Sequence, residues 1–171
     1  MTCQARTLEL RGAARALTGD ELKSYQLGRS IYLRDAHCGT CHQPNGEGMT
    51  AMYPTLAKSE WLNSDERLIK IVLKGLWGPM EINGQKFDPT KGVPPMPGFG
   101  GFLSDEEVAG VASYVRQSFG NDLPLITAAQ VAKVRAATKD RADAVDVAVD
   151  VDTEPREPRD GVGEVDRTAC F

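Results

Sequence analysis

Residues 35–48 read DAHCGTCHQPNGEG, and positions 38–42 within them hold two of the chain's four cysteines and one of its two histidines. Cys38, Cys41 and His42 form the pattern C-x-x-C-H, which is typical of covalent haem attachment. Two thiols one helical turn apart can bond to one haem, and the histidine that follows can turn its imidazole toward the iron. The sequence therefore predicts one covalently attached haem c, with His42 as an axial ligand.

Two other uses of the cysteine pair have weaker support. A zinc site needs two further Cys or His ligands at matched spacing, but only Cys3, His37 and Cys170 remain, at the chain ends or beside the motif. A thioredoxin-like pair needs a βαβ setting, whereas helix and loop patterns surround this one. We expect His37 to be a surface or loop histidine on the proximal side of the haem. Cys3 and Cys170 could bridge the termini, pair between chains or stay free.

A closed iron site needs a sixth ligand, and methionine sulfur gives a higher potential than a second histidine would. We prefer Met96, because the prolines of residues 92–99, GVPPMPGF, restrict the backbone of its loop. Met80, which follows a predicted helix end, is the second candidate. Met49 and Met52 are so close to the cysteine motif that we expect them to pack in the loop or touch the haem edge.

Two helices are predicted in the first half of the chain. Thr18 and Glu21 have the spacing of a capping box, and the apolar residues that follow favour a helix that runs into the cysteine motif. Ser64 is placed to cap a second helix, DERLIKIVLKGLWG, with acidic residues at its start and lysines toward its end. The proline and glycine content of residues 78–102 excludes long helices and central strands there.

Two further helices are predicted in the second half. Ser104 and Glu107 form a second capping box, followed by valines and alanines at helical spacing. Thr127 and Gln130 open a shorter and weakly amphipathic helix.

The chain changes in character after Arg141. Residues 143–152, DAVDVAVDVD, place valine at every second position, which fits a strand with one apolar side. An alternative is that residues 145–151 pair with RTLEL, residues 6–10, as a two-stranded ribbon, which would be marginal without further packing. The remainder is charged and contains proline, and we expect it to be a linker or a flexible tail.

The overall composition restricts the classes of protein to which this chain can belong. The chain has 171 residues, a formal net charge of −4 and 41% hydrophobic residues, which favours one compact domain plus extensions. We expect no nucleic-acid partner, because Lys and Arg are scattered among carboxylates rather than gathered in a basic stripe. The apolar runs are far shorter than a membrane-spanning segment. Residues 1–17 lack the apolar core of a secretory signal.

With these motifs in place, the chain resembles a monohaem class I cytochrome c over roughly Leu17 to Asn121. The resemblance implies an all-α fold, with helices packed around one covalently bound haem, an additional C-terminal helix and a partly irregular tail. The boundaries we expect are an N-terminal extension, a cytochrome c domain, the additional helix and an acidic, flexible tail (1–16, 17–123, 124–142 and 143–171). More closely, GDELKSYQLGRSIYLRDAHCGTCHQPNGEG and GVPPMPGFGGFLSDEEVAGVASYVRQSFGN look like the C-terminal cytochrome domains of planctomycete-type dehydrogenase-like proteins.

The resemblance also implies roles for single residues. It makes Cys38 and Cys41 the thioether sites, His42 the proximal ligand and Met96 the distal ligand. It further implies that the first helix, through a glycine and an aromatic, crosses the last helix of the domain near an aromatic there (Gly28, Tyr32 and Tyr114). The glycine and the aromatic lie two residues farther from the first cysteine than in the commonest members, so that contact could be shifted.

The implied function is electron transfer rather than catalysis. We expect electrons to pass from an extracytoplasmic dehydrogenase to a cytochrome or oxidase acceptor. The location would be the periplasm or another compartment outside the cytoplasm, where haem is attached. Apolar residues around the haem would raise its potential (Leu56, Trp61, Leu68, Val72, Leu76, Trp77 and Phe99). The two tryptophans could instead be buried core residues, or an indole N–H could bond to a haem propionate. The alternatives are a structural or assembly subunit of a larger redox complex, and a haem sensor or peroxidase with an open site.

Overall fold

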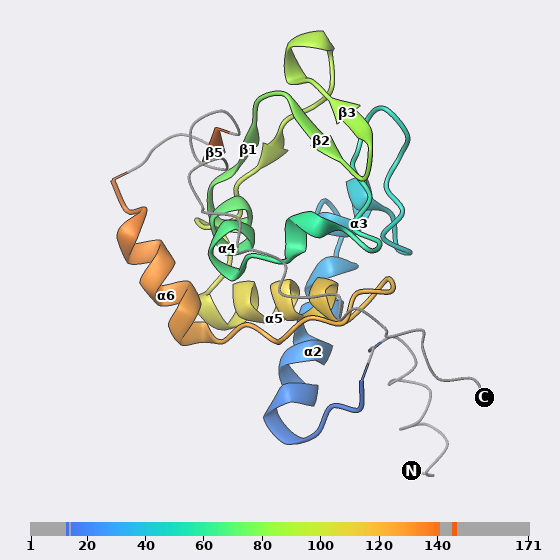
Figure 1. Ribbon diagram of the computed structural model, residues 1–171. Helices are drawn as coiled ribbons and strands as arrows, with labels where there is room; N and C mark the ends of the chain where they lie inside the picture. Colours follow the sequence, from blue (N-terminus) through green and yellow to red (C-terminus); the bar gives the residue numbers. More distant parts are fainter. Residues whose placement is uncertain (1–12, 14, 141–144, 147–171) are drawn as a thin grey trace, which may run out of the picture.

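The structure is a computed structural model that describes residue 13, residues 15–140 and the backbone of residues 145–146. The proposed bridge between Cys3 and Cys170 and the N-terminal partner of the proposed ribbon lie outside these residues. In Figure 1 the helices α2 and α5 cross, α6 lies beside α5, and the short strands lie on the far side of α5 from α2. The elements in chain order are α2 (Gly19–Tyr32), α3 (Cys38–His42), η1 (Glu60–Leu62), α4 (Asp65–Lys74), β1 (Gly75–Trp77), β2 (Met80–Ile82), β3 (Gln85–Phe87), η2 (Pro89–Lys91), β4 (Met96–Pro97), α5 (Asp105–Arg116), α6 (Ala128–Ala137) and β5 (Val145–Asp146).

The helices α2 and α5 cross with their backbones in direct contact. A Cβ atom on Gly28 would lie 1.9 Å from the carbonyl oxygen of Gly110, so only glycine allows the two backbones to meet. Next to this contact, the ring of Tyr114 lies 5.2 Å from the rings of both Tyr25 and Tyr32. The contact of Gly28 and Tyr32 with the last helix of the domain is therefore present at the expected residues.

The predicted starts of α4, α5 and α6 are confirmed. The hydroxyl of Ser64 accepts a backbone hydrogen bond from the first turn of α4. Complete capping boxes join Ser104 with Glu107 at α5 and Thr127 with Gln130 at α6. These caps form because each depends on residues only three positions apart.

The first helix differs from the expectation at both ends. Thr18 is the N-cap of α2, but its side chain makes no capping hydrogen bond. Glu21 is also paired outside the helix, because its carboxylate accepts two hydrogen bonds from the Arg15 guanidinium, at 2.8 and 3.2 Å. The helix also ends at Tyr32, and a turn separates it from α3. The expectation of one helix running into the cysteine motif was therefore wrong.

The strands are short and join distant parts of the chain. β1 pairs with β4 in antiparallel register, with Gly75 opposite Pro97 and Leu76 opposite Met96. β1 also pairs in parallel with β5, which lies in the segment expected to form a strand. β2 and β3 form a separate hairpin. The proline-rich stretch thus contains no long helix among its described residues, but it does contain two-residue and three-residue strands that sequence patterns did not reveal.

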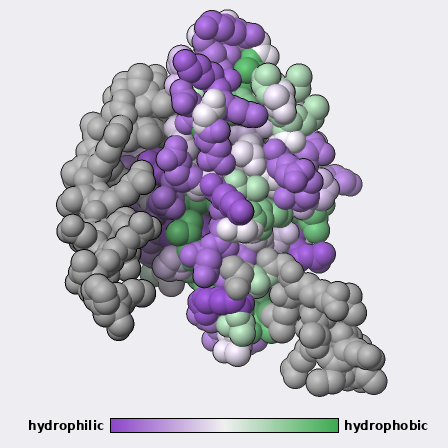
Figure 2. Space-filling model, turned by 45° about the vertical axis from the view of Figure 1, so that its right-hand side comes forward, coloured by the Kyte–Doolittle hydropathy of each residue, from purple (hydrophilic) through white to green (hydrophobic). Residues whose placement is uncertain are grey.

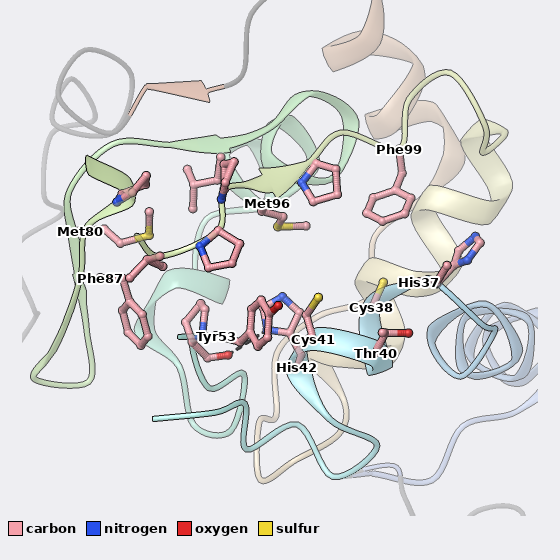
Figure 3. Close-up of a pocket in the computed structure, with 18 residues that line it drawn as sticks. His37, Cys38, Thr40, Cys41, His42, Tyr53, Met80, Phe87, Met96 and Phe99 are labelled. Atoms are coloured by element: carbon pink, nitrogen blue, oxygen red, sulfur yellow. Dashed lines mark hydrogen bonds between the residues drawn. The ribbon is translucent and has the colours of Figure 1, made fainter. Parts of the chain in front are cut away.

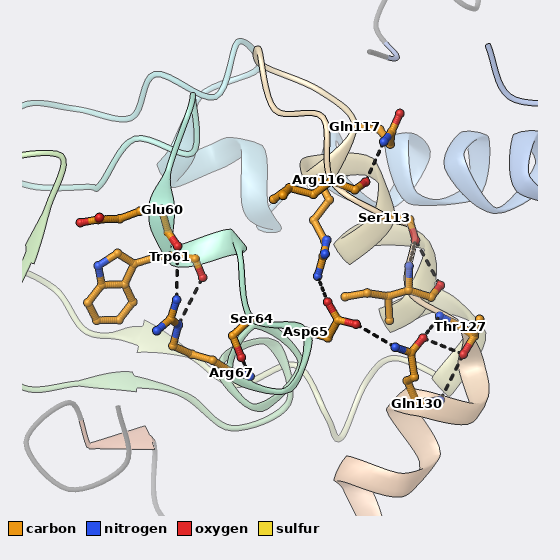
Figure 4. Close-up of polar contacts among 12 residues, drawn as sticks. Glu60, Trp61, Ser64, Asp65, Arg67, Ser113, Arg116, Gln117, Thr127 and Gln130 are labelled. Atoms are coloured by element: carbon orange, nitrogen blue, oxygen red, sulfur yellow. Dashed lines mark hydrogen bonds and ion pairs between the residues drawn. The ribbon is translucent and has the colours of Figure 1, made fainter. Parts of the chain in front are cut away.

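The additional helix α6 is part of the main core. Val131 and Val134 are 0% and 7% exposed and belong to the same hydrophobic cluster as residues of α2, α4 and α5. Asp65, at the start of α4, accepts hydrogen bonds from Arg116 of α5 and from Gln130 of α6, the latter at 2.9 Å (Figure 4). The bond from Gln130 therefore joins α6 to α4, and the shared Asp65 carboxylate joins both helices to α5.

The face of the molecule drawn in Figure 2 is mainly polar. On the face drawn in Figure 2, hydrophilic residues predominate and hydrophobic ones form small patches between them. None of the helices in the described part of the chain combines the length and the apolar character needed to cross a membrane.

Candidate haem-binding site

A cavity of about 310 Å³ opens between α3 and the methionine loop, residues 92–99 (Figure 3). Cys38, Cys41 and His42 lie along one side of it, and Met96 lies on the opposite side. Most of its remaining lining is apolar and includes Phe87. Its volume falls within the range of about 300–1,000 Å³ that is usual for ligand pockets.

The two cysteines are presented by one helical turn. α3 consists of the five residues CGTCH, so Cys38 and Cys41 lie three positions apart on the same helix face. Both are free thiols, and burial raises the pKa of Cys38 to about 11. A thiol of this kind is neutral at physiological pH, unlike the low-pKa cysteines of disulfide oxidoreductases. Among the described residues, no three His, Cys, Asp or Glu side chains gather as metal ligands.

His42 is held in one orientation. Its imidazole Nδ1 donates a hydrogen bond to the carbonyl oxygen of Pro54, 2.8 Å away, which leaves Nε2 as the nitrogen able to bind a metal. The side chain is buried, and this burial lowers its pKa, although the bond to Pro54 opposes the shift. A neutral imidazole whose other nitrogen bonds to a backbone carbonyl is the usual state of a histidine ligand.

Met96 and Met80 both line the cavity, but they occupy different places. Figure 3 shows Met96 across from Cys41 and His42, whereas Met80 lies to one side, near Phe87. The strand β4 holds the backbone of Met96 against Leu76 of β1. The other two candidate residues are surface side chains: Met49 is 44% exposed and Met52 is 42% exposed.

A second cavity, of about 80 Å³, adjoins the first. The two share lining residues from both sides of the site (Cys38, His42, Pro54, Leu76, Met96 and Phe99). Five of the residues expected around a haem line one or both cavities (Leu56, Trp61, Val72, Leu76 and Phe99). Leu68 lies in the main core.

The two tryptophans differ from their expected roles. The expectation that Trp77 would be buried was wrong, because its side chain is 43% exposed. Trp61 lines the second cavity, but its indole N–H donates to the carbonyl oxygen of Glu81 at 3.0 Å. Its donor therefore already has a backbone partner.

His37 is a loop residue, as expected, yet it also borders the cavity. Its Nδ1 lies 2.9 Å from the carbonyl oxygen of Asp35, and its ring centroid lies 5.5 Å from that of Phe99. Sequence reasoning missed Tyr53, Pro54 and Phe87, which also line the cavity. Only the loop composition around the first two could have drawn attention to them.

These features together fit a covalently held haem. The cavity is mainly apolar, two free thiols lie one helical turn apart on its border, and a neutral buried imidazole adjoins them. A methionine sulfur is available on the opposite side. Thioether formation, iron ligation and burial of a largely apolar ring each have a matching group in this arrangement.

Comparison with known proteins agrees with this chemistry. The sequence model of the family described as cytochrome c matches residues 25–119. Cytochrome c-552 of Thermus thermophilus is 36% identical over 119 residues, covering 64% of this chain and 84% of that protein.

Two dehydrogenase subunits are also similar. The cytochrome c subunit of the alcohol dehydrogenase (quinone) of Gluconobacter oxydans is 32% identical over 114 residues, covering 63% of this chain and 22% of that subunit. The cytochrome c subunit of the gluconate 2-dehydrogenase of Pantoea cypripedii is 34% identical over 114 residues, covering 64% of this chain and 24% of that subunit. This chain thus spans less than a quarter of the length of either subunit. On the family match and the composition of its cavity, the chain belongs to the cytochrome c family, whose members transfer electrons through a covalently bound haem c.

Proposed function

We propose that this chain is an electron carrier whose haem is attached through Cys38 and Cys41 and ligated by His42 and Met96. The observation that carries the proposal is the placement of Met96 across the cavity from His42. When bound, haem supplies a reversible one-electron couple. A site closed by two protein ligands favours electron transfer over reactions that need an open position on the iron.

The protein residues contribute orientation and a dry environment. The bond from His42 Nδ1 to the Pro54 carbonyl fixes the imidazole and increases its basicity as a ligand. Apolar side chains such as Val72, Leu76 and Phe99 keep water away from the site. Such surroundings disfavour the additional positive charge of the ferric state and therefore raise the reduction potential.

The proposed partners are redox proteins outside the cytoplasm, with a dehydrogenase as donor and a cytochrome or oxidase as acceptor. The similarity to cytochrome subunits of dehydrogenases supports this assignment. Because the chain spans only a fraction of those subunits, the identity of the donor stays a prediction. The likeness to planctomycete-type cytochrome domains also stays a prediction.

The ligand assignment can be tested by absorption spectroscopy of the haem-loaded protein. We expect Met96→Ala to remove the weak long-wavelength band of sulfur-to-ferric-iron charge transfer while the haem stays covalently bound. Met80→Ala is the matched control, because that methionine borders the same cavity, and it should keep the band. Loss of the band in the Met80 variant alone would assign the ligand to Met80 instead.

Two further measurements test the rest of the proposal. The intact mass of the matured chain should exceed the polypeptide mass by the mass of one haem, and replacement of Cys38 and Cys41 by alanine should abolish this increase.

The reduced wild-type protein should bind carbon monoxide slowly, since Met96 must first leave the iron. Rapid binding at neutral pH would favour an open-site sensor or peroxidase.

A further inference from the structure

Arg135 of α6 makes contacts with the segment that follows the methionine loop. Its Nε donates to the Asp105 carboxylate at 2.7 Å, its Nη1 to the Gly100 carbonyl at 2.5 Å and its Nη2 to the Leu103 carbonyl at 2.9 Å. The side chain is 33% exposed. The planar guanidinium suits this arrangement, because its donors are held in a rigid fork that can satisfy several acceptors at once.

The segment that Arg135 holds is also bound from the opposite side. The backbone N–H of Phe99 donates to the Val72 carbonyl at 2.9 Å, and that of Gly100 donates to the Leu73 carbonyl at 3.0 Å. A Cβ atom on Gly100 would lie 2.6 Å from the Leu73 oxygen, so the two backbones are in direct contact. α4 therefore binds the N–H groups of this turn, and Arg135 binds its carbonyl groups.

This turn is the C-terminal anchor of the loop that carries Met96. The strand β4 comprises only Met96 and Pro97, and a two-residue strand contributes little stability by itself. The position of the sulfur therefore depends on how well the chain is held just beyond the strand. Phe99, between β4 and the anchor, also lines both cavities.

The helix that provides Arg135 is itself well anchored. Val131 and Val134, on the same helix, are buried in the main core, and Gln130 bonds to Asp65 of α4. α6 lies outside residues 25–119, which the family model matches. The helix thus brings a fixed cation to a loop within the matched domain.

We propose that Arg135 is a positioning residue for Met96, through which α6 keeps the methionine loop closed over the haem site. This inference rests on the proposed function, in which Met96 is an axial ligand. Without the arginine, the turn at Gly100–Leu103 loses the donors to two carbonyls, and the loop opens more often. A competing ligand then finds the sixth position on the iron vacant more frequently.

The test is an imidazole titration of the ferric, haem-loaded full chain. Its apparent dissociation constant equals the intrinsic constant divided by the fraction of molecules with an open loop. We expect Arg135→Gln to lower the apparent constant by roughly tenfold, the effect of losing charge-assisted bonds to partly buried acceptors. Lys133→Gln is the matched control, since it removes a positive charge from an exposed position of the same helix; we expect a change of less than about twofold.

Two comparisons separate positioning from general stabilisation. In guanidinium titrations, the sulfur-to-iron band of Arg135→Gln should disappear at a lower denaturant concentration than its far-ultraviolet helix signal, and the gap between the two should be wider than in wild type. Coincident loss of both signals would overturn the proposal. Arg135→Lys keeps the charge but not the fork, so its imidazole affinity should resemble that of Arg135→Gln. A value equal to wild type would overturn the role assigned to the fork.

The outcomes also distinguish this inference from the proposed function. If the wild-type protein shows no sulfur-to-iron band, the ligand assignment fails, and the inference fails with it. If the wild-type band is present but Arg135→Gln binds imidazole like Lys133→Gln, the positioning role alone is wrong.

Discussion

The two sides of the haem cavity are built in different ways. The side that carries the thiols is one continuous turn, α3, supported by the crossing of α2 and α5 and by the Tyr32 ring against Tyr114. The side that carries Met96 is assembled from short strands, and its contacts reach α4, α6 and β5. One side is a local structure on rigid helices, and the other depends on several distant segments.

This difference predicts two kinds of mutational effect. A change beneath the cysteine turn disturbs the helix pair on which the whole fold rests, so its effect appears in global stability. A change in the methionine side can release one ligand while the helices and the attached haem stay in place. Because local opening needs less free energy than global unfolding, the methionine side should respond first to most perturbations.

The largest expected effect is that of Gly28→Ala, on the helical side. Alanine would gain up to about 1 kcal/mol of helix propensity at an open position, but here its Cβ would lie 1.9 Å from the Gly110 oxygen. We expect the free energy of unfolding to fall by about 3 kcal/mol or more, because the two backbones must separate. Guanidinium denaturation followed by circular dichroism measures the change.

Gly101→Ala is the control for that experiment, since nothing lies within 4 Å of a Cβ atom placed there. Its stability should change by less than about 1 kcal/mol. Equal stability of the Gly28 variant and wild type would mean that the helix crossing is not the support of the cysteine turn.

Next in size is Gly75→Ala, on the methionine side. Gly75 has φ of 84°, and a Cβ atom would lie 2.3 Å from the Met96 carbonyl oxygen. We expect β4 to move away from β1 at a cost of about 2–3 kcal/mol, with weakening of the sulfur-to-iron band and retention of the haem. The absorption spectrum at neutral pH checks this expectation.

The control for Gly75 is Gly92→Ala. Gly92 has φ of 93°, but a Cβ atom added to it would meet nothing within 4 Å, so the variant measures backbone strain without the clash. The band should persist in it. Equal loss of the band in both variants would trace the effect to strain and not to the contact with Met96.

A smaller effect is expected for Asn121→Ala, which tests how the loop behind His42 is held. The Asn121 amide donates to the carbonyls of Leu56 and Val115 at 2.8 and 2.9 Å, and its oxygen accepts from the Ser59 N–H at 3.2 Å. Loss of these buried bonds should reduce the free energy of unfolding by about 2 kcal/mol. Thermal denaturation is a suitable measurement, and the exposed Asn45→Ala should shift it far less.

The smallest effect is that of Thr127→Ala, which weakens the start of α6. Removal of an N-cap hydroxyl costs about 1 kcal/mol, and here the capping box with Gln130 would be lost. Denaturant titration should show this change, whereas the exposed Thr50→Ala should be close to wild type. An unchanged Thr127 variant would indicate that burial of Val131 and Val134 alone sets the position of α6.

Local patterns explain which features could be predicted. The caps at Ser64, Ser104 and Thr127 were predicted correctly because a cap needs only a hydroxyl and a backbone N–H a few residues away. Thr18 is the exception, because its hydroxyl makes no capping hydrogen bond although it is the N-cap residue of α2. The three-residue spacing of a capping box therefore favours a cap without ensuring it.

Features that depend on contacts across the chain were not predicted. The pairing of β1 with β4 involves residues about twenty positions apart, and two-residue or three-residue strands leave no periodic pattern. The acceptor for the Trp61 indole, the carbonyl of Glu81, likewise became evident from the folded chain. Trp77 is 43% exposed at the end of β1, although a large aromatic side chain is usually mostly buried.

Residues 38–42 alone implied the cofactor, because thioether attachment and histidine ligation require three groups at fixed spacing within one helical turn. The residue facing them was less firmly indicated by the sequence, because the prolines around Met96 favoured it but Met80 offers the same thioether sulfur. Packing of β4 against β1, and the binding of Gly100 between α4 and Arg135, place Met96 rather than its competitors across from His42. Covalent geometry acts over a few residues, whereas the position of a loop is set by whichever distant surfaces it packs against.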